Sequence, residues 1–243
     1  MGNTYYAPGE SRATKVNDLF AAIAPRYDLI NDLQSFGLHR WWKRRLVRLS
    51  GAQPGRTALD VCCGTGDLAF ALARAGAEVV GLDFSEPMLE VARQRGKGGS
   101  TASVGRVQFV VGDAMKIPFP DASFDITTVG YGLRNLSDWR AGLAEMKRVT
   151  RPGGSLLVLD FGKPDNPVWR GIYFAYLRFA VPMWGRVFSR DAEAYAYILE
   201  SLHPYPAQRG VERQMRELGC ASIQIINLLG GVMSINVGRQ PLS

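Results

Sequence analysis

Residues Thr57 to Asp67 read TALDVCCGTGD, an apolar run that leads into a glycine-rich turn. The stretch begins as a short apolar strand, and the Gly64-Thr65-Gly66 turn that follows lets the backbone approach a ligand closely. In open α/β sheets, ligands bind at the carboxyl ends of the strands. We therefore expect a ligand site at the end of this strand.

The chain continues from this turn as alternating helices and strands. Strands that alternate with helices over about 100 residues predict a parallel sheet that is covered on both faces. The expected strands are 57–61, 78–82, 107–111, 124–129 and 155–161. The expected helices are 67–74, 87–95 and 139–149, with Ser137 as the N-cap of the last and a turn over 151–154.

Further helices flank this region on both sides. The sequence predicts helices over 15–24, 25–33 and 38–49 before it, and an aromatic-rich helical stretch over 167–181 with helices 192–202 and 211–218 after it. Strands 222–227 and 232–237 close the chain. We expect one α/β domain with a doubly wound, mostly parallel, seven-stranded Rossmann-like sheet. Its expected parts are an N-terminal helical cap (1–55), a cofactor-binding core (56–161), a helical cap insertion (162–220) and a C-terminal strand pair (221–243).

The composition is that of a soluble globular protein, with 47% hydrophobic and 21% charged residues in 243. The three cysteines give neither a disulfide framework nor a zinc-ligand spacing, so we expect a reducing compartment and no metal. The first ten residues lack a signal-peptide pattern, and no window reaches the roughly 18 apolar residues of a membrane span. These features predict a cytoplasmic location.

The net charge of +7 is partly concentrated between Arg40 and Arg48. Such a run is either a solvated helix face or a contact for an anionic partner. We expect peripheral contact with an anionic membrane surface, with Trp41 and Trp42 at the interface. The basic residues expected to make it are Arg40, Lys43, Arg44 and Arg48. A nucleic-acid partner is not expected, because the chain has no Asn/Asp-Pro-Pro-Tyr motif or cysteine nucleophile for base methylation.

Acidic residues follow three successive expected strands. Asp60 is placed to bind the amino group of an amino-acid moiety, and Asp83 has the spacing of a residue that binds ribose hydroxyls. Asp113 is placed to accept a hydrogen bond from an adenine amino group. Together they favour an adenosine cofactor that carries an amino acid. Because Gly64-x-Gly66 also satisfies the dinucleotide fingerprint, an NAD(P)-dependent oxidoreductase or a non-catalytic binding module stays open.

Several longer segments carry a family resemblance. They are APRYDLIND (24–32), GLHRWW (37–42), GLDFSEPML (81–89), IPFPD (117–121), GLRN (132–135), RPGG (151–154), DAEAY (191–195) and NLLGG (227–231). With the glycine turn, they resemble class I S-adenosyl-L-methionine (SAM)-dependent methyltransferases, and more narrowly the C-methyltransferases of menaquinone and ubiquinone biosynthesis. The match covers nearly the whole chain.

The resemblance implies methyl transfer from SAM to a ring carbon of a polyprenylated quinol, with S-adenosyl-L-homocysteine as the product. The residues implied for cofactor binding are Asp60, Gly64, Thr65, Gly66, Asp83, Phe84, Asp113, Ala114 and Gly130. Those expected to be catalytic are Arg134, Tyr27 and Asp28, and those expected to bind substrate are Tyr27, Asn31, Arg134, Asn135 and Asp160. Arg134 and Tyr27 would hold the quinol hydroxyl, while water or a carboxylate takes its proton.

Three positions depart from the family pattern. Cys62 stands where the first glycine of the loop is expected, Asp160 where Glu is common, and Asn236 where a His is usual. The sequence leaves open a benzoquinol or a naphthoquinol ring, the prenyl tail and a homodimer. The alternative function is SAM-dependent methylation of another small apolar or phenolic acceptor.

Overall fold

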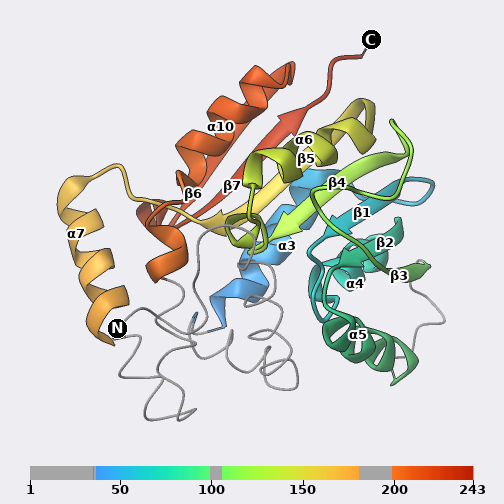
Figure 1. Ribbon diagram of the computed structural model, residues 1–243, viewed down its shortest axis with the longest axis horizontal. Helices are drawn as coiled ribbons and strands as arrows, with labels where there is room; N and C mark the ends of the chain where they lie inside the picture. The colour runs from blue at the N-terminus through green and yellow to red at the C-terminus, as the bar shows by residue number, and fades with distance from the viewer. Residues whose placement is uncertain (1–34, 36, 99–105, 181–198, 243) are drawn as a thin grey trace.

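A seven-stranded sheet forms the centre of the protein (Figure 1). The computed structural model describes residues 35, 37–98, 106–180 and 199–242. The strands lie in the order β3-β2-β1-β4-β5-β7-β6; neighbours from β3 to β5 are parallel, and β7 is antiparallel to both β5 and β6. Their bounds are β1 Thr57–Val61, β2 Glu78–Asp83, β3 Val107–Val111, β4 Phe124–Gly130, β5 Thr150–Phe161, β6 Ser222–Leu228 and β7 Met233–Arg239. The predicted doubly wound, mostly parallel seven-stranded sheet is confirmed.

Helices cover both faces of this sheet because its central strands are apolar on both sides. In β5, Leu156 and Val158 pack in one core with α6 and α10, while Leu157 and Leu159 pack in a second core with α3 and α4. The helices are α3 Leu38–Ser50, α4 Asp67–Arg74, α5 Glu86–Gly98, α6 Trp139–Val149, α7 Pro167–Ala175 and α10 Ala207–Glu217. Figure 1 shows α7 and α5 at opposite sides of the molecule.

The expected N-cap of α6 was wrong by one residue. Asp138 caps this helix, because its carboxylate accepts hydrogen bonds from the backbone of Arg140 (2.9 Å) and Ala141 (3.2 Å). Ser137 instead places its hydroxyl 3.2 Å from the sulfur of Met115. Both residue types favour N-caps, but the aspartate stands next to the first helical residue.

The turn expected over residues 151–154 is a bulge inside a longer strand. Thr150 pairs with Phe124 and Ser155 pairs with Ile126, so these four residues stand opposite a single residue of β4. Gly153 has φ +70°, a left-handed conformation that glycine adopts without strain. The turn residues therefore bend β5 instead of ending it.

The region after β5 differs in its bounds from the prediction. The stretch expected to be helical over 167–181 forms α7 and then a π-helical turn, Tyr176–Ala180. Residues 199–202 are helical, and α10 begins at Ala207, four residues before its expected start. The helices expected over 15–24 and 25–33, and most of the one over 192–202, lie outside the described residues. Within the described ranges, no helix is long and apolar enough to cross a membrane.

Candidate functional site

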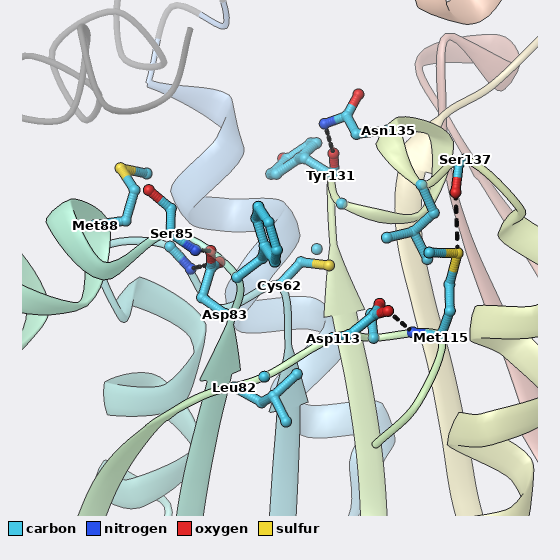
Figure 2. A pocket seen from close by; sticks show the side chains of 17 residues that line it. Cys62, Leu82, Asp83, Ser85, Met88, Asp113, Met115, Tyr131, Asn135 and Ser137 are labelled. Atoms are coloured by element: carbon cyan, nitrogen blue, oxygen red, sulfur yellow. Dashed lines mark hydrogen bonds between the residues drawn. The ribbon is translucent and has the colours of Figure 1, made fainter. Parts of the chain in front are cut away.

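A pocket lies at the carboxyl ends of β1, β2, β3 and β4 (Figure 2). These four strands are neighbours, so the loops that follow them meet at one edge of the sheet. The pocket encloses about 870 Å³ of empty space, including its open mouth. Its lining consists of Cys62, Gly64, Leu82, Asp83, Phe84, Ser85, Met88, Gly112, Asp113, Ala114, Met115, Gly130, Tyr131, Gly132, Asn135, Leu136 and Ser137.

The loop after β1 depends on left-handed backbone conformations. Cys62 has φ +54°, Gly64 +54° and Gly66 +83°. A Cβ atom on Gly66 would lie 2.9 Å from the rings of Phe70 and Phe109, so a larger residue there would displace an aromatic ring. Cys62 thus adopts a conformation that favours glycine, at the position where the family pattern has one. Cys62, which departs from the family pattern, therefore has a strained backbone conformation.

Asp83 joins this loop to β2. Its Oδ2 accepts a hydrogen bond from the Gly64 backbone N–H (2.8 Å) and its Oδ1 accepts one from Ser85 (2.9 Å). Burial raises the pKa of the Asp83 carboxyl, and these backbone hydrogen bonds oppose the rise. Figure 2 shows the carboxylate at the pocket, and the ring of Phe84, 55% exposed, lines it beside Asp83.

Asp60 is buried at the end of β1, behind the loop, and does not line the pocket. Its Oδ1 accepts a hydrogen bond from Thr128 Oγ1 (2.9 Å), while no residue of the described ranges makes a hydrogen bond of good geometry to its Oδ2. Burial raises the pKa of Asp60 to about 7, although the Thr128 hydrogen bond and the charge of Lys43 act in the opposite direction. An unpaired, buried carboxylate oxygen is costly, and a cation brought near it would relieve that cost.

The loops after β3 and β4 form the rest of the wall. Asp113 is exposed, and its Oδ1 accepts a hydrogen bond from the Met115 backbone (2.8 Å). Tyr131 has φ +64°, and its ring lies 5.8 Å from Lys43 Nζ. A Cβ atom on Gly132 would overlap the side chain of Cys62, so the β4 loop approaches the β1 loop as closely as a glycine allows.

Arg134 lies behind this wall, in the short helix Leu133–Asn135. Its Nη1 donates hydrogen bonds to Asp160 Oδ1 (2.9 Å) and to the Tyr131 carbonyl (2.6 Å), and its Nε donates one to Ser201 (3.3 Å). The guanidinium also lies 4.7 Å from the centre of the Phe161 ring. Arg134 therefore ties the β4 loop to the end of β5.

The structure brings together many of the residues that the sequence indicated. Gly64, Asp83, Phe84, Asp113, Ala114, Gly130 and Asn135 line the pocket. Thr65 and Gly66 belong to the β1 loop without lining it, and Asp60, Arg134 and Asp160 are buried next to the lining residues. Tyr27, Asp28 and Asn31 lie outside the described residues.

Sequence reasoning did not assign a role to other lining residues. These are Cys62, Leu82, Ser85, Met88, Gly112, Met115, Tyr131, Gly132, Leu136 and Ser137. The sequence signal that could have identified them is their position at or shortly after the ends of the expected strands. Ser85 and Met88 lie in the 81–89 segment, and Gly132 lies in the 132–135 segment, both of which carried the family resemblance.

The basic run on α3 is only partly exposed. Lys43 is buried and forms a 2.9 Å ion pair with Asp67, and Trp42 is buried in the core. The expectation that these two side chains contact a membrane was wrong, because helical periodicity turns them inward. Arg40, Trp41, Arg44 and Arg48 are exposed.

Comparisons with known proteins agree with this fold and site. Residues 9–240 match the ubiE/COQ5 methyltransferase family. A demethylmenaquinone methyltransferase of Staphylococcus aureus (strain JH9) is 38% identical over 235 residues, which cover 96% of this chain and 95% of that protein.

Solved structures show the same fold. A putative SAM-dependent methyltransferase from Methanococcus maripaludis has a TM-score of 0.63 at 23% identity, covering 93% of this chain and 94% of that one. A SAM-dependent methyltransferase from Aquifex aeolicus has a TM-score of 0.58 at 17% identity, covering 83% and 91%. The chain belongs to the ubiE/COQ5 methyltransferase family and is a SAM-dependent methyltransferase.

Proposed function

We propose that this protein methylates a ring carbon of a polyprenylated quinol, namely a naphthoquinol of the demethylmenaquinol type. The observation that carries this proposal is the 38% identity to a demethylmenaquinone methyltransferase over 96% of the chain. That span includes the 162–220 segment after β5 as well as the core, so it covers the cap that we expect to contact the acceptor. A benzoquinol is the second candidate ring.

The chemistry of the pocket residues fits SAM. The unpaired Oδ2 of Asp60 suits the cationic amino-acid end, although Asp60 itself lies behind the loop. The Asp83 carboxylate suits a ribose diol because a carboxylate accepts two hydrogen bonds, and the exposed ring of Phe84 suits a flat base. We propose that Asp113 and Ala114 contact the adenine, and that Gly64, Thr65, Gly66 and Gly130 allow close approach.

When bound, SAM supplies an activated methyl group, and the protein must hold an electron-rich carbon in line with it. A reduced ring with an ionising hydroxyl is electron-rich, and a nearby fixed cation favours its ionised form. We propose that Arg134 supplies this charge while Asp160 holds its guanidinium in place. Asn135 lines the pocket and is proposed to contact the ring. Tyr27, Asp28 and Asn31 are proposed to complete the acceptor site.

A polyprenylated acceptor resides in a membrane, so the enzyme must meet a lipid surface. We propose a peripheral, salt-sensitive contact through the exposed arginines of α3, Arg40, Arg44 and Arg48, with Trp41 at the interface. The homodimer considered from the sequence stays a prediction, which light scattering on the purified protein tests.

The activity is tested with radiolabelled SAM and demethylmenaquinol. We expect transfer to the dithionite-reduced acceptor and none to the oxidised quinone, whose ring is electron-poor. A demethylated benzoquinol, assayed in parallel, decides the ring. Equal turnover of the reduced and oxidised acceptor, or no transfer to either ring, would overturn the proposal.

The cofactor site is tested separately by titration calorimetry. Asp83→Ala should weaken SAM binding by about 2–4 kcal/mol through the loss of charge-assisted hydrogen bonds. Asp165→Ala, an exposed aspartate of the segment after β5, serves as the control and should leave the affinity unchanged. An Asp83→Ala protein that is folded and binds SAM normally would contradict the assignment.

A further inference from the structure

Two tyrosines after β5 have buried hydroxyl groups without a partner. Tyr173 of α7 is 5% exposed, and Tyr205, which lies just before α10, is 3% exposed. Within the part of the chain that the structure describes, neither hydroxyl has a hydrogen-bond partner. Folded proteins rarely leave a buried polar group unpaired, and such groups often have a functional role. Two in one region therefore require an explanation.

Both phenols lie near the ion pair of Arg134 and Asp160. They belong to the same core cluster as the residues around that pair, and the charges of Arg134 and Asp160 act on the pKa of both phenols. Arg134 Nε also donates a hydrogen bond to Ser201, which lies four residues before Tyr205 in the sequence. The two hydroxyls, the guanidinium and the carboxylate, which interact electrostatically, are here called the polar cluster.

This cluster adjoins the pocket on the side away from Asp83. Asn135, the neighbour of Arg134, lines the pocket, and so do the next two residues, Leu136 and Ser137. Figure 2 shows Asn135 and Ser137 on the opposite side of the pocket from Asp83 and Ser85. A group that extends from the pocket past Asn135 would therefore approach Arg134, whose charge acts on both phenols.

The cluster is suited to a ligand oxygen that accepts hydrogen bonds. Burial raises the pKa of both phenols, so each keeps its proton at neutral pH and can donate a hydrogen bond. Arg134 adds a permanent positive charge, and Asp160 already accepts hydrogen bonds from the guanidinium and from two backbone N–H groups. An additional ligand would thus meet two hydroxyl donors and a fixed cation.

We propose that the hydroxyl groups of Tyr173 and Tyr205 bind the ring oxygen of the phenolic acceptor. The identity of that acceptor rests on the proposed function. The oxygen gains two hydroxyl donors beside the Arg134–Asp160 ion pair. The region after β5 would then recognise the ring oxygen of the acceptor, which distinguishes it from a hydrocarbon.

The test uses the variants Tyr173→Phe and Tyr205→Phe, alone and together. Because each lost hydroxyl has no hydrogen-bond partner among the described residues, the melting temperature should stay the same or rise. The probe is 1-naphthol, a redox-stable phenol, titrated in the presence of S-adenosyl-L-homocysteine; 1-methylnaphthalene is the control ligand without oxygen. We expect each variant to bind 1-naphthol roughly tenfold more weakly, with 1-methylnaphthalene binding unchanged.

Tyr176→Phe is the matched control, since this tyrosine follows α7 and is 36% exposed. It should bind 1-naphthol as the original protein does. The inference is overturned if the original protein does not prefer 1-naphthol over 1-methylnaphthalene. It is also overturned if the double variant keeps that preference, or if both ligands weaken equally.

A methylation assay separates this inference from the proposed function. If the original protein methylates demethylmenaquinol and the double variant has an unchanged KM and kcat, the inference fails while the function stands. If the tyrosines confer the preference for 1-naphthol but demethylmenaquinol is not methylated, the proposed substrate fails and the phenol site stands.

Discussion

The guanidinium of Arg134 lies 2.9 Å from the carboxylate of Asp160, and the two side chains are only 6% and 2% exposed. Asp160 also accepts a hydrogen bond from the Arg134 backbone N–H at 3.2 Å. The pair fixes the loop after β4 to the end of β5, at the wall of the pocket. The two charges compensate each other where little water reaches them.

Removing the carboxylate should therefore be costly. Asp160→Ala would leave the buried guanidinium without its counter-charge, and we expect a loss of about 3–5 kcal/mol in the free energy of unfolding. Urea denaturation measures it. Asp165→Ala breaks the exposed ion pair with Arg209 and should cost less than about 1 kcal/mol. Similar losses of unfolding free energy in the two variants would show that the buried ion pair stabilises the protein no more than the exposed one.

The stability of the protein should fall as Asp60 ionises. Its pKa is raised from 3.8 to about 7, so the folded protein retains a proton that the unfolded chain has already released. Between about pH 4 and pH 7 the folded state therefore binds more protons, and rising pH favours unfolding. Above the folded pKa this effect levels off.

Asp60→Asn isolates this effect because asparagine resembles the protonated carboxyl. Urea denaturation of both proteins should show the variant gaining about 2–3 kcal/mol relative to the original between pH 5 and pH 8. Titrations of groups that do not interact with Asp60 cancel in the difference. Parallel pH profiles for the two proteins would refute the raised pKa.

The contact between Cys62 and Gly132 predicts coupled substitutions. Gly132→Ala places a methyl group against the Cys62 side chain and should destabilise the protein by about 1–3 kcal/mol. In a Cys62→Gly background the obstruction is gone, so the same change should cost much less. Thermal denaturation of the four proteins in this cycle measures the coupling.

The control for this cycle is Gly171→Ala in α7. An added Cβ there meets nothing within 4 Å, and alanine favours a helix by up to about 1 kcal/mol over glycine. We expect no loss of stability. Additive effects of the changes at 62 and 132 would rule out the steric coupling.

The membrane contact predicts that charges on α3 matter more than charges elsewhere. Replacing Arg40, Arg44 and Arg48 by glutamine should weaken binding to anionic liposomes by about 1 kcal/mol per residue at low salt. The same replacement of Arg209, Arg213 and Arg216, exposed on α10, lowers the net charge equally and should have little effect. If the two triple variants float equally with the liposomes, the net charge alone determines binding, and α3 is not the contact surface.

The core of the fold was predictable because its signals are local. The bounds of β1, β3 and α4 agree with the sequence pattern, since short apolar runs ended by glycine or charge leave few alternatives. Asp83 and Asp113 were predictable as site residues for a related reason. In a parallel sheet, the residue that ends a strand reaches the shared edge whatever the details of packing.

The remaining site depends on contacts that no local pattern encodes. Arg134 meets Asp160 and Ser201, which lie 26 and 67 residues further along the chain. Lys43 forms its ion pair with Asp67, 24 residues away, and the basic run alone does not reveal that partner. The left-handed backbone of Tyr131 likewise depends on the loop around it, because tyrosine does not favour that conformation.

The segment between β5 and α10 is closed at its base by one side chain. Gln208 Oε1 accepts a hydrogen bond from the Lys163 backbone N–H, and its Nε2 donates one to the Lys163 carbonyl, both at 2.9 Å and 45 residues apart in sequence. From the sheet side, Asn236 Nδ2 donates to the Gln208 carbonyl at 2.9 Å. The two ends of the insertion therefore meet at a single fixed point on the sheet. A change in the length or side chains of this segment would therefore leave the strands at the cofactor edge of the sheet in place.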